Sequence, residues 1–142
     1  DSLVYVLTGD GELQEGQNWE AFMYASANNV DNIIVTVDYN GQQIDGSTED
    51  VLDIGNLQLK LESFNWKVLI IENGNSLDEV YDTLNEAKNN SKNGKPIVIL
   101  MKTIMGNGVD FMMHSHKWHG VAPNDEQLKE ALNQNPETLG DY

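Results

Sequence analysis

A carboxylate and an amide each follow an apolar stretch of this chain at the point where a strand would end. Asp10 closely follows the apolar residues 3–7, and Asn40 closely follows the apolar residues 33–37. The carboxyl ends of parallel strands meet at one edge of an α/β sheet, where such sheets bind ligands. Carboxylate and amide oxygens suit Mg²⁺, which takes few protein ligands and completes its octahedron with phosphate and water. The pattern therefore predicts a magnesium and phosphate site at this edge.

Taken alone, each of these residues also has a simpler interpretation. Asp10 could cap a following helix, which is a common use of Asp in a strand-to-helix turn. Asn40-Gly41 is also a frequent turn pair. Glu15 and Glu20 could be solvent-exposed acids, as most glutamates are. These alternatives stay open on the short motifs alone.

The longer pattern resembles the thiamine-diphosphate-binding domain of the transketolase family, and most of all the N-terminal subunit of transketolases encoded by two genes. The resemblance extends from the first strand to Pro123. It is carried by the segments GDGELQEG (9–16), WEA (19–21), DYNGQQIDG (38–46), KTIMGNGV (102–109) and WHGVAP (118–123). It implies an α/β fold with a doubly wound parallel sheet and helices on both faces. Residues 1–142 would form one domain, lacking its N-terminal part, and apolar surface would be left uncovered.

The resemblance also implies a role for the matched residues near the two strand ends. Asp10, the Asn40 side chain and the backbone carbonyl of Gln42 would bind Mg²⁺, and Gly9 and Gly11 would border the diphosphate of the cofactor. A backbone carbonyl ligand tolerates any side chain, so the glutamine at position 42 is compatible with this role.

The predicted catalytic residues are His119 and Glu15. By the resemblance, His119 would contact the diphosphate and the sugar, and Glu15, with Glu20, would lie at a dimer interface near the active sites. His116 is at a spacing where some transketolases carry another active-site histidine, whereas His114 matches nothing in the family.

Two apolar residues beside the glycine turns, Ile44 and Met105, are expected to line the ring system of the cofactor. Either could instead be an ordinary core residue.

The chemistry implied is transfer of a two-carbon ketol unit between sugar phosphates, as in the pentose phosphate pathway, with thiamine diphosphate and Mg²⁺. The glutamate that activates the cofactor in the family belongs to a pyrimidine-binding domain, which nothing in this chain resembles. We therefore expect an inactive half-site that needs a C-terminal, pyrimidine-binding partner subunit, in a dimer or heterotetramer.

Other function classes are less well supported. A deoxyxylulose-phosphate synthase or a 2-oxoacid dehydrogenase subunit would share the cofactor, but the segments 14–16 (QEG) and 118–120 (WHG) favour a transketolase. A nicotinamide-binding domain needs Gly-x-Gly-x-x-Gly, a spacing that Gly9, Gly11 and Gly16 do not supply. A non-catalytic acidic interaction module is the remaining alternative.

Composition excludes several partners. The net charge is −15 and all eight basic residues are lysines, which disfavours nucleic-acid binding and leaves no arginine for a phosphate clamp. There is no apolar run of the roughly 20 residues that a membrane span requires. The absence of cysteine excludes disulfides and is compatible with a cytoplasmic protein.

Periodicity predicts alternating strands and helices, which is the pattern of a parallel sheet. Strands are predicted at residues 3–7, 33–37, 66–71 and 96–101. Helices are predicted after Gly16 to about residue 29, over 54–64, from a Ser76–Glu79 capping box through Ala87, and from Asn124 until Pro136 ends it. Residues 41–48 are predicted to be a polar loop, and 103–123 a long loop that holds all three histidines.

Overall fold

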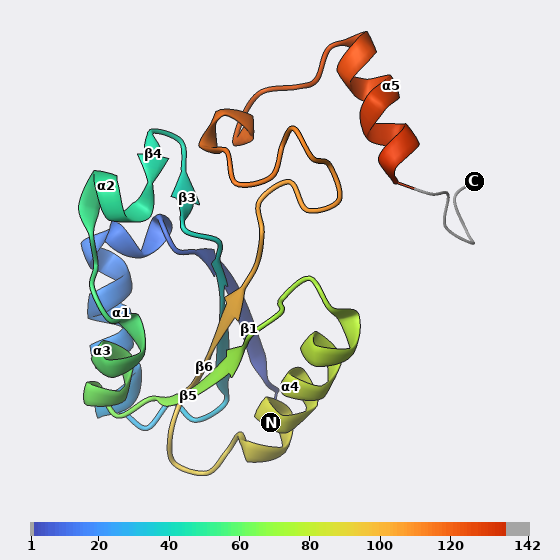
Figure 1. Cartoon of the computed structure of the whole chain (residues 1–142). Coiled ribbons are helices and arrows are strands. Elements are labelled where there is room, and N and C mark those ends of the chain that lie inside the picture. The colour runs from blue at the N-terminus through green and yellow to red at the C-terminus, as the bar shows by residue number, and fades with distance from the viewer. Residues whose placement is uncertain (1, 136–142) are drawn as a thin grey trace.

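The computed structural model describes residues 2–135, which form a four-stranded parallel sheet with helices on both faces (Figure 1). The strand order is β1-β2-β6-β5. The strands are β1 (Val4–Gly9), β2 (Ile33–Tyr39), β5 (Lys67–Ile71) and β6 (Ile97–Lys102). The predicted doubly wound α/β fold is confirmed, and all four predicted strands form. Pro136, predicted to end the last helix, lies outside the described residues.

Helices cover the two faces of the sheet in separate layers. α1 (Gly16–Ala27) and α3 (Leu57–Ser63) lie on one face, and α4 (Leu77–Asn90) lies on the other (Figure 1). β6 is buried on both faces: Val98 and Leu100 belong to the core under α1 and α3, whereas Ile97 and Ile99 belong to the core under α4. A continuous apolar run is what a strand covered on both sides requires.

One predicted helix start and one predicted capping box need correction. The helix predicted from residue 54 begins at Leu57, because Gly55 has a positive φ of 62° and Asn56 caps the helix by accepting from Leu59 N. At the start of α4, Ser76 accepts from Glu79 N, but the Glu79 carboxylate accepts from Asn73 N instead of completing a capping box. The complete box is at α5 (Asp125–Gln134), between Asn124 and Gln127.

The segment predicted to be a polar loop has regular structure. β3 (Gln42–Gln43) and β4 (Gly46–Ser47) form an antiparallel hairpin, and α2 (Thr48–Leu52) follows it. Only two residue pairs form the hairpin, which is too short to leave an alternating pattern. The remaining short helices are the 3₁₀ turns η1 (Glu12–Gln14) and η2 (His116–Trp118).

β1 forms one edge of the sheet and exposes its apolar side chains. Tyr5 and Leu7 lie on the same face of the sheet as α4. This helix packs against β5 and β6, and Leu7 on β1 is 71% exposed. With Val80 and Leu84 of α4 they line an apolar hollow of about 320 Å³. Uncovered apolar surface was expected, and these side chains provide it. None of the described helices is long and apolar enough to cross a membrane.

Candidate functional site

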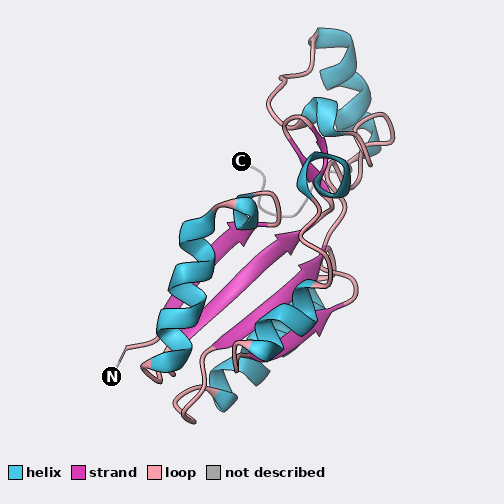
Figure 2. Ribbon diagram, turned by 90° about the vertical axis from the view of Figure 1, so that its left-hand side faces the viewer, coloured by secondary structure: helices cyan, strands magenta, loops and turns pink. Residues whose placement is uncertain are grey.

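The carboxyl ends of β1 and β2 meet at one edge of the sheet, beyond which the hairpin and α5 extend (Figure 2). Gly9 pairs with Asp38 in register, and Asp10 N donates to the Asp38 carbonyl at 3.1 Å. The chain places Asp10 one residue after β1 and Asn40 one residue after β2. The sheet therefore brings the two residues to the same edge, as the sequence predicts.

Asp10 is a buried carboxylate held by backbone amides. It is 1% exposed, and its two oxygens accept from Gly11 N at 2.8 Å and from Gly41 N at 2.6 Å. Its side chain caps no helix, because Gly11 is the N-cap of η1 and Glu15 the N-cap of α1. The helix-capping interpretation of Asp10 is therefore wrong.

Burial raises the pKa of Asp10 above its ordinary value. Hydrogen bonds from the Gly41 and Gly11 amides oppose this rise, and the negative charge of Asp38 adds to it. A cation bound here would favour the ionised carboxylate. The electrostatic environment of Asp10 therefore suits a residue that shares its charge with a metal ion.

Asn40 is oriented by Asp38, a residue to which the sequence pattern assigned no role. Asn40 Nδ2 donates to Asp38 Oδ2 at 3.1 Å, and Asn40 Oδ1 accepts from Gln42 N at 2.8 Å. The other Asp38 oxygen accepts from the hydroxyl of Thr103, which follows β6. The position of Asp38 two residues before Asn40 was visible in the sequence, but its contact with Thr103 was not.

Most of the predicted site residues line one hollow of about 510 Å³. This size is typical of ligand sites. Its lining includes Gly9, Asp10, Gly11, Glu15, Asn40, Gln42, Ile44 and His119. Met105 is the exception: it lines an adjoining hollow of about 470 Å³ with Leu7 and Met101. The two hollows share Asp38, Asn40 and His119, so Ile44 and Met105 lie on different sides of a common boundary.

The three histidines occupy different environments. His119 follows η2 and lines both hollows. His116 lies within η2, which packs against β4, and it lines neither hollow. His114 is exposed and has a positive φ of 58°. Only His119 is thus positioned to contact a molecule bound at the edge of the sheet.

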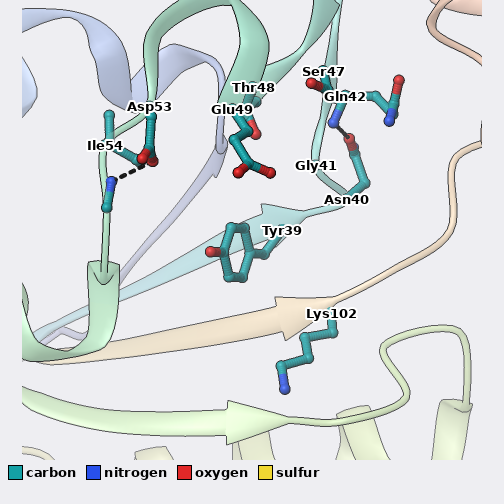
Figure 3. Close-up of a pocket in the computed structure, with 11 residues that line it drawn as sticks. Tyr39, Asn40, Gly41, Gln42, Ser47, Thr48, Glu49, Asp53, Ile54 and Lys102 are labelled. Carbon is teal, nitrogen blue, oxygen red and sulfur yellow. Dashed lines mark hydrogen bonds between the residues drawn. The ribbon is translucent and has the colours of Figure 1, made fainter.

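A fourth hollow, of about 540 Å³, is lined by residues 39–42, 47–49 and 53–55 and by Lys102 (Figure 3). Figure 3 shows the Asn40 side chain turned back toward Gln42 N and the Glu49, Asp53 and Lys102 side chains around the space. Lys102 forms an ion pair with Glu72 at 2.6 Å. No sequence pattern predicted this hollow.

The donor set at the edge fits Mg²⁺. Across residues 2–135, no group of three or more His, Cys, Asp or Glu side chains could hold a metal ion. A metal here would rely on the one carboxylate of Asp10 and on neutral oxygens, with the rest supplied by phosphate and water, as Mg²⁺ prefers. Each Asp10 oxygen accepts one N–H group and keeps a further lone pair.

A parallel sheet with glycines and oxygen ligands at its carboxyl edge defines an α/β domain that binds a phosphate-bearing cofactor. The family model described as the thiamine diphosphate binding domain of transketolase matches residues 1–138. The chain therefore belongs to this family, and the resemblance inferred from the motifs is confirmed.

The chain is similar to proteins that are named as transketolase subunits. The chain is 39% identical over 131 residues to one such subunit, from the apulose-4-phosphate transketolase of Actinobacillus succinogenes, covering 92% of this chain and 46% of that protein. It is 37% identical over 129 residues to the 6-deoxy-6-sulfo-D-fructose transketolase subunit SqwG of a Clostridium species, covering 91% and 46%. The chain thus spans about half the length of these relatives.

Solved structures of transketolases share the fold. The Campylobacter jejuni enzyme matches 94% of this chain with a TM-score of 0.84 and 35% identity, over 20% of its own length. The Pichia stipitis enzyme, in its complex with sedoheptulose 7-phosphate, also matches 94% of this chain, with a TM-score of 0.85 and 27% identity, over 19% of its own length.

Proposed function

We propose that this chain is the cofactor-binding portion of a cytoplasmic transketolase that transfers a two-carbon ketol unit between sugar phosphates. The cofactors would be thiamine diphosphate and Mg²⁺. The observation that carries the proposal is the hollow in which the buried Asp10 meets Asn40, Gln42 and His119. Membership of a thiamine-diphosphate-binding family supports the choice of cofactor.

Each residue of the hollow has a defined task in this proposal. Asp10, the Asn40 side-chain oxygen and the Gln42 carbonyl hold Mg²⁺, which neutralises the diphosphate and positions it. Gly9 and Gly11 border the diphosphate. Thiamine diphosphate, when bound, supplies the nucleophilic carbon for the transfer.

The residues at the margins of the site bind and orient. Ile44 and Met105 line the two adjoining hollows, and in this proposal they would contact the ring system of the cofactor. His119 lies where the hollows meet, so its imidazole donates a hydrogen bond to a phosphate or sugar oxygen and can move a proton there. Glu15 is exposed at the mouth of the hollow, and in this proposal it belongs to a dimer interface.

In this proposal residues 1–142 act as a single domain and provide half of an active site. The other half is a C-terminal, pyrimidine-binding subunit that carries the activating glutamate, assembled with this one as a dimer or heterotetramer. Its support is that the two relatives described above are named as transketolase subunits.

Calorimetry with thiamine diphosphate, with and without Mg²⁺, tests the proposal. Wild-type chain should bind the cofactor weakly and only with Mg²⁺, and Asp10→Ala should lose this dependence because it removes the one charged metal ligand. Asp82→Ala, at an exposed carboxylate of α4, is the matched control and should bind like wild type. Equal Mg²⁺-dependent binding by Asp10→Ala and wild type would refute the metal assignment.

A further inference from the structure

The side-chain amide of Asn40 has two ends, and only one of them can bind a metal ion. Asn40 Oδ1 is an acceptor, whereas Asn40 Nδ2 is only a donor. Two contacts fix which way the amide lies: Nδ2 donates to Asp38 Oδ2 at 3.1 Å, and Oδ1 accepts from Gln42 N at 2.8 Å. Exchange of the two ends would break both hydrogen bonds and place Oδ1 against the Asp38 carboxylate. In the observed orientation Oδ1 keeps a further lone pair for the proposed ion.

The carboxylate of Asp38 is itself held from the neighbouring strand. Its other oxygen, Oδ1, accepts from the Thr103 hydroxyl. β6 pairs with β2 in register as far as Tyr39 and Lys102, and Thr103 N extends this pairing by donating to the Tyr39 carbonyl at 3.4 Å. The residue that follows β6 therefore helps to determine where the Asp38 carboxylate lies.

A glycine in the loop after β5 packs against the methyl group of Thr103. Gly74 N donates to the Lys102 carbonyl at 2.6 Å, and a Cβ atom at Gly74 would lie 2.8 Å from Thr103 Cγ2. Threonine carries its methyl and its hydroxyl on the same carbon atom, so a contact that fixes one group also fixes the direction of the other. The close approach of Gly74 thus restricts the Thr103 hydroxyl to the side on which it meets Asp38.

We propose that Asp38 and Thr103 form a positioning pair, which orients the Asn40 amide for Mg²⁺. Neither residue of the pair touches the ion. Thr103 holds Asp38, and Asp38 holds the nitrogen end of Asn40, so that the oxygen end stays with the ion. The inference rests on the proposed function, because it requires Mg²⁺ at Asn40. Residues that hold a metal ligand in place typically change metal affinity 10- to 100-fold.

Removing either member of the positioning pair should weaken Mg²⁺ binding in the presence of thiamine diphosphate. Thr103→Val keeps the shape of the side chain but removes one hydrogen bond, and should bind about fivefold more weakly. Thr103→Ser keeps the hydroxyl and should stay within about twofold of wild type. Asp38→Ala should weaken binding about 10-fold without abolishing it. Thr83→Val, at a partly exposed position of α4, is the matched control and should bind like wild type.

A change at Asn40 itself separates positioning from a merely structural role. A carboxylate presents an oxygen at either end, so the side chain of Asn40→Asp needs no partner to orient it. In the Asn40→Asp background, Thr103→Val should therefore change Mg²⁺ affinity by less than about twofold. A structural role would give the same loss in both backgrounds, because its effect would not pass through the Asn40 amide.

Calorimetric titration of the 142-residue chain with Mg²⁺ at excess thiamine diphosphate gives these affinities. Thermal unfolding in chelator shows whether each variant is folded. If Thr103→Val does not fold, Thr103→Ala, which also lacks the hydroxyl, takes its place in both backgrounds with the same expected result.

Failure of the inference differs from failure of the proposed function. If Asp10→Ala abolishes Mg²⁺ binding but Thr103→Val binds within about twofold of wild type, the metal site stands and the positioning pair is refuted. An equal loss with Asn40 and with Asn40→Asp also refutes it, and abolition of binding by Asp38→Ala would make Asp38 a ligand instead. If wild type binds no Mg²⁺, the proposed metal site is wrong and the inference fails with it.

Discussion

Replacing Gly11 with alanine should destabilise the protein through one steric contact. The backbone at Gly11 has φ −62° and ψ −35°, a right-handed conformation open to any residue, so alanine meets no backbone strain. The added Cβ would lie 2.9 Å from Gln43 Cβ, whereas carbon atoms in contact normally lie about 3.5–4.0 Å apart. The hairpin that carries Gln42 and Gln43 must therefore shift by roughly 0.6 Å or more to make this space.

The size of the effect follows from two opposing contributions. Overpacking of this kind costs about 1–3 kcal/mol. Replacing glycine by alanine in a compatible conformation stabilises the folded state by about 0.4–1 kcal/mol, because the unfolded chain has less conformational freedom. The net loss of unfolding free energy should be about 1–2 kcal/mol, which corresponds to a fall of about 3–6 °C in the thermal midpoint for a chain of this size.

Urea unfolding of matched variants measures this loss. Gly9→Ala is the control, since a Cβ at Gly9 meets nothing within 4 Å, and its unfolding free energy should stay within about 0.5 kcal/mol of wild type. Adding Gln43→Gly to Gly11→Ala removes the contact, so the double variant should lose less than the sum of the single changes. Equal stability of Gly11→Ala and Gly9→Ala, or strict additivity with Gln43→Gly, would refute this account of the contact.

Three further predictions concern pH, activity and assembly. The pKa of Asp10 is raised above 3.8 in the folded protein. The metal-free folded state therefore keeps this proton up to a higher pH than the unfolded chain does. The contribution of Asp10 to the unfolding free energy therefore falls as pH rises from about 4 through the raised pKa. Asp10→Asn should lose this pH dependence in urea unfolding. The same pH dependence in Asp10→Asn and wild type would contradict the assignment. The isolated chain should show no ketol transfer, and a complex reconstituted with a pyrimidine-binding subunit should lose activity with His119→Ala but hardly with His114→Ala; equal losses would remove His119 from the site. The exposed apolar side chains of β1 should cause self-association or partner binding, and Leu7→Lys should weaken it. Sedimentation of wild type as a strict monomer, both alone and with a pyrimidine-binding subunit, would count against this surface.

The sequence specified the parts of this fold that depend on periodicity and strand ends. Continuous apolar runs located β2 and β6, and the rule that parallel strands end at one edge placed Asp10 near Asn40. Both rest on local pattern plus one topological constraint. The same reasoning located most of the hollow, because most of its lining residues closely follow strands or belong to the hairpin beyond them.

Contacts between distant segments could not be predicted in this way. The hydrogen bond from Thr103 to Asp38 joins residues 65 positions apart, and neither residue type signals the other. Ile44 and Met105 were both expected to line the ring system of the cofactor, but the sequence did not show that the loop after β6 places Met105 in a hollow adjoining that of Ile44. The hairpin at residues 42–47 was missed because two residue pairs carry too little alternation to detect.

The carboxylate of Asp38 links the residues that follow β2 to the residue that follows β6. It holds the Asn40 amide with one oxygen and the Thr103 hydroxyl with the other, and it belongs to β2 itself. From these two contacts we expect occupancy of the hollow and order in the segment that leads to His119 to be thermodynamically linked, and any such coupling is reciprocal. A ligand that binds at Asn40 should make the segment from Thr103 to His119 more ordered. A second molecule that immobilises this segment should raise the affinity for the first ligand, and the first ligand should raise the affinity for the second by the same factor.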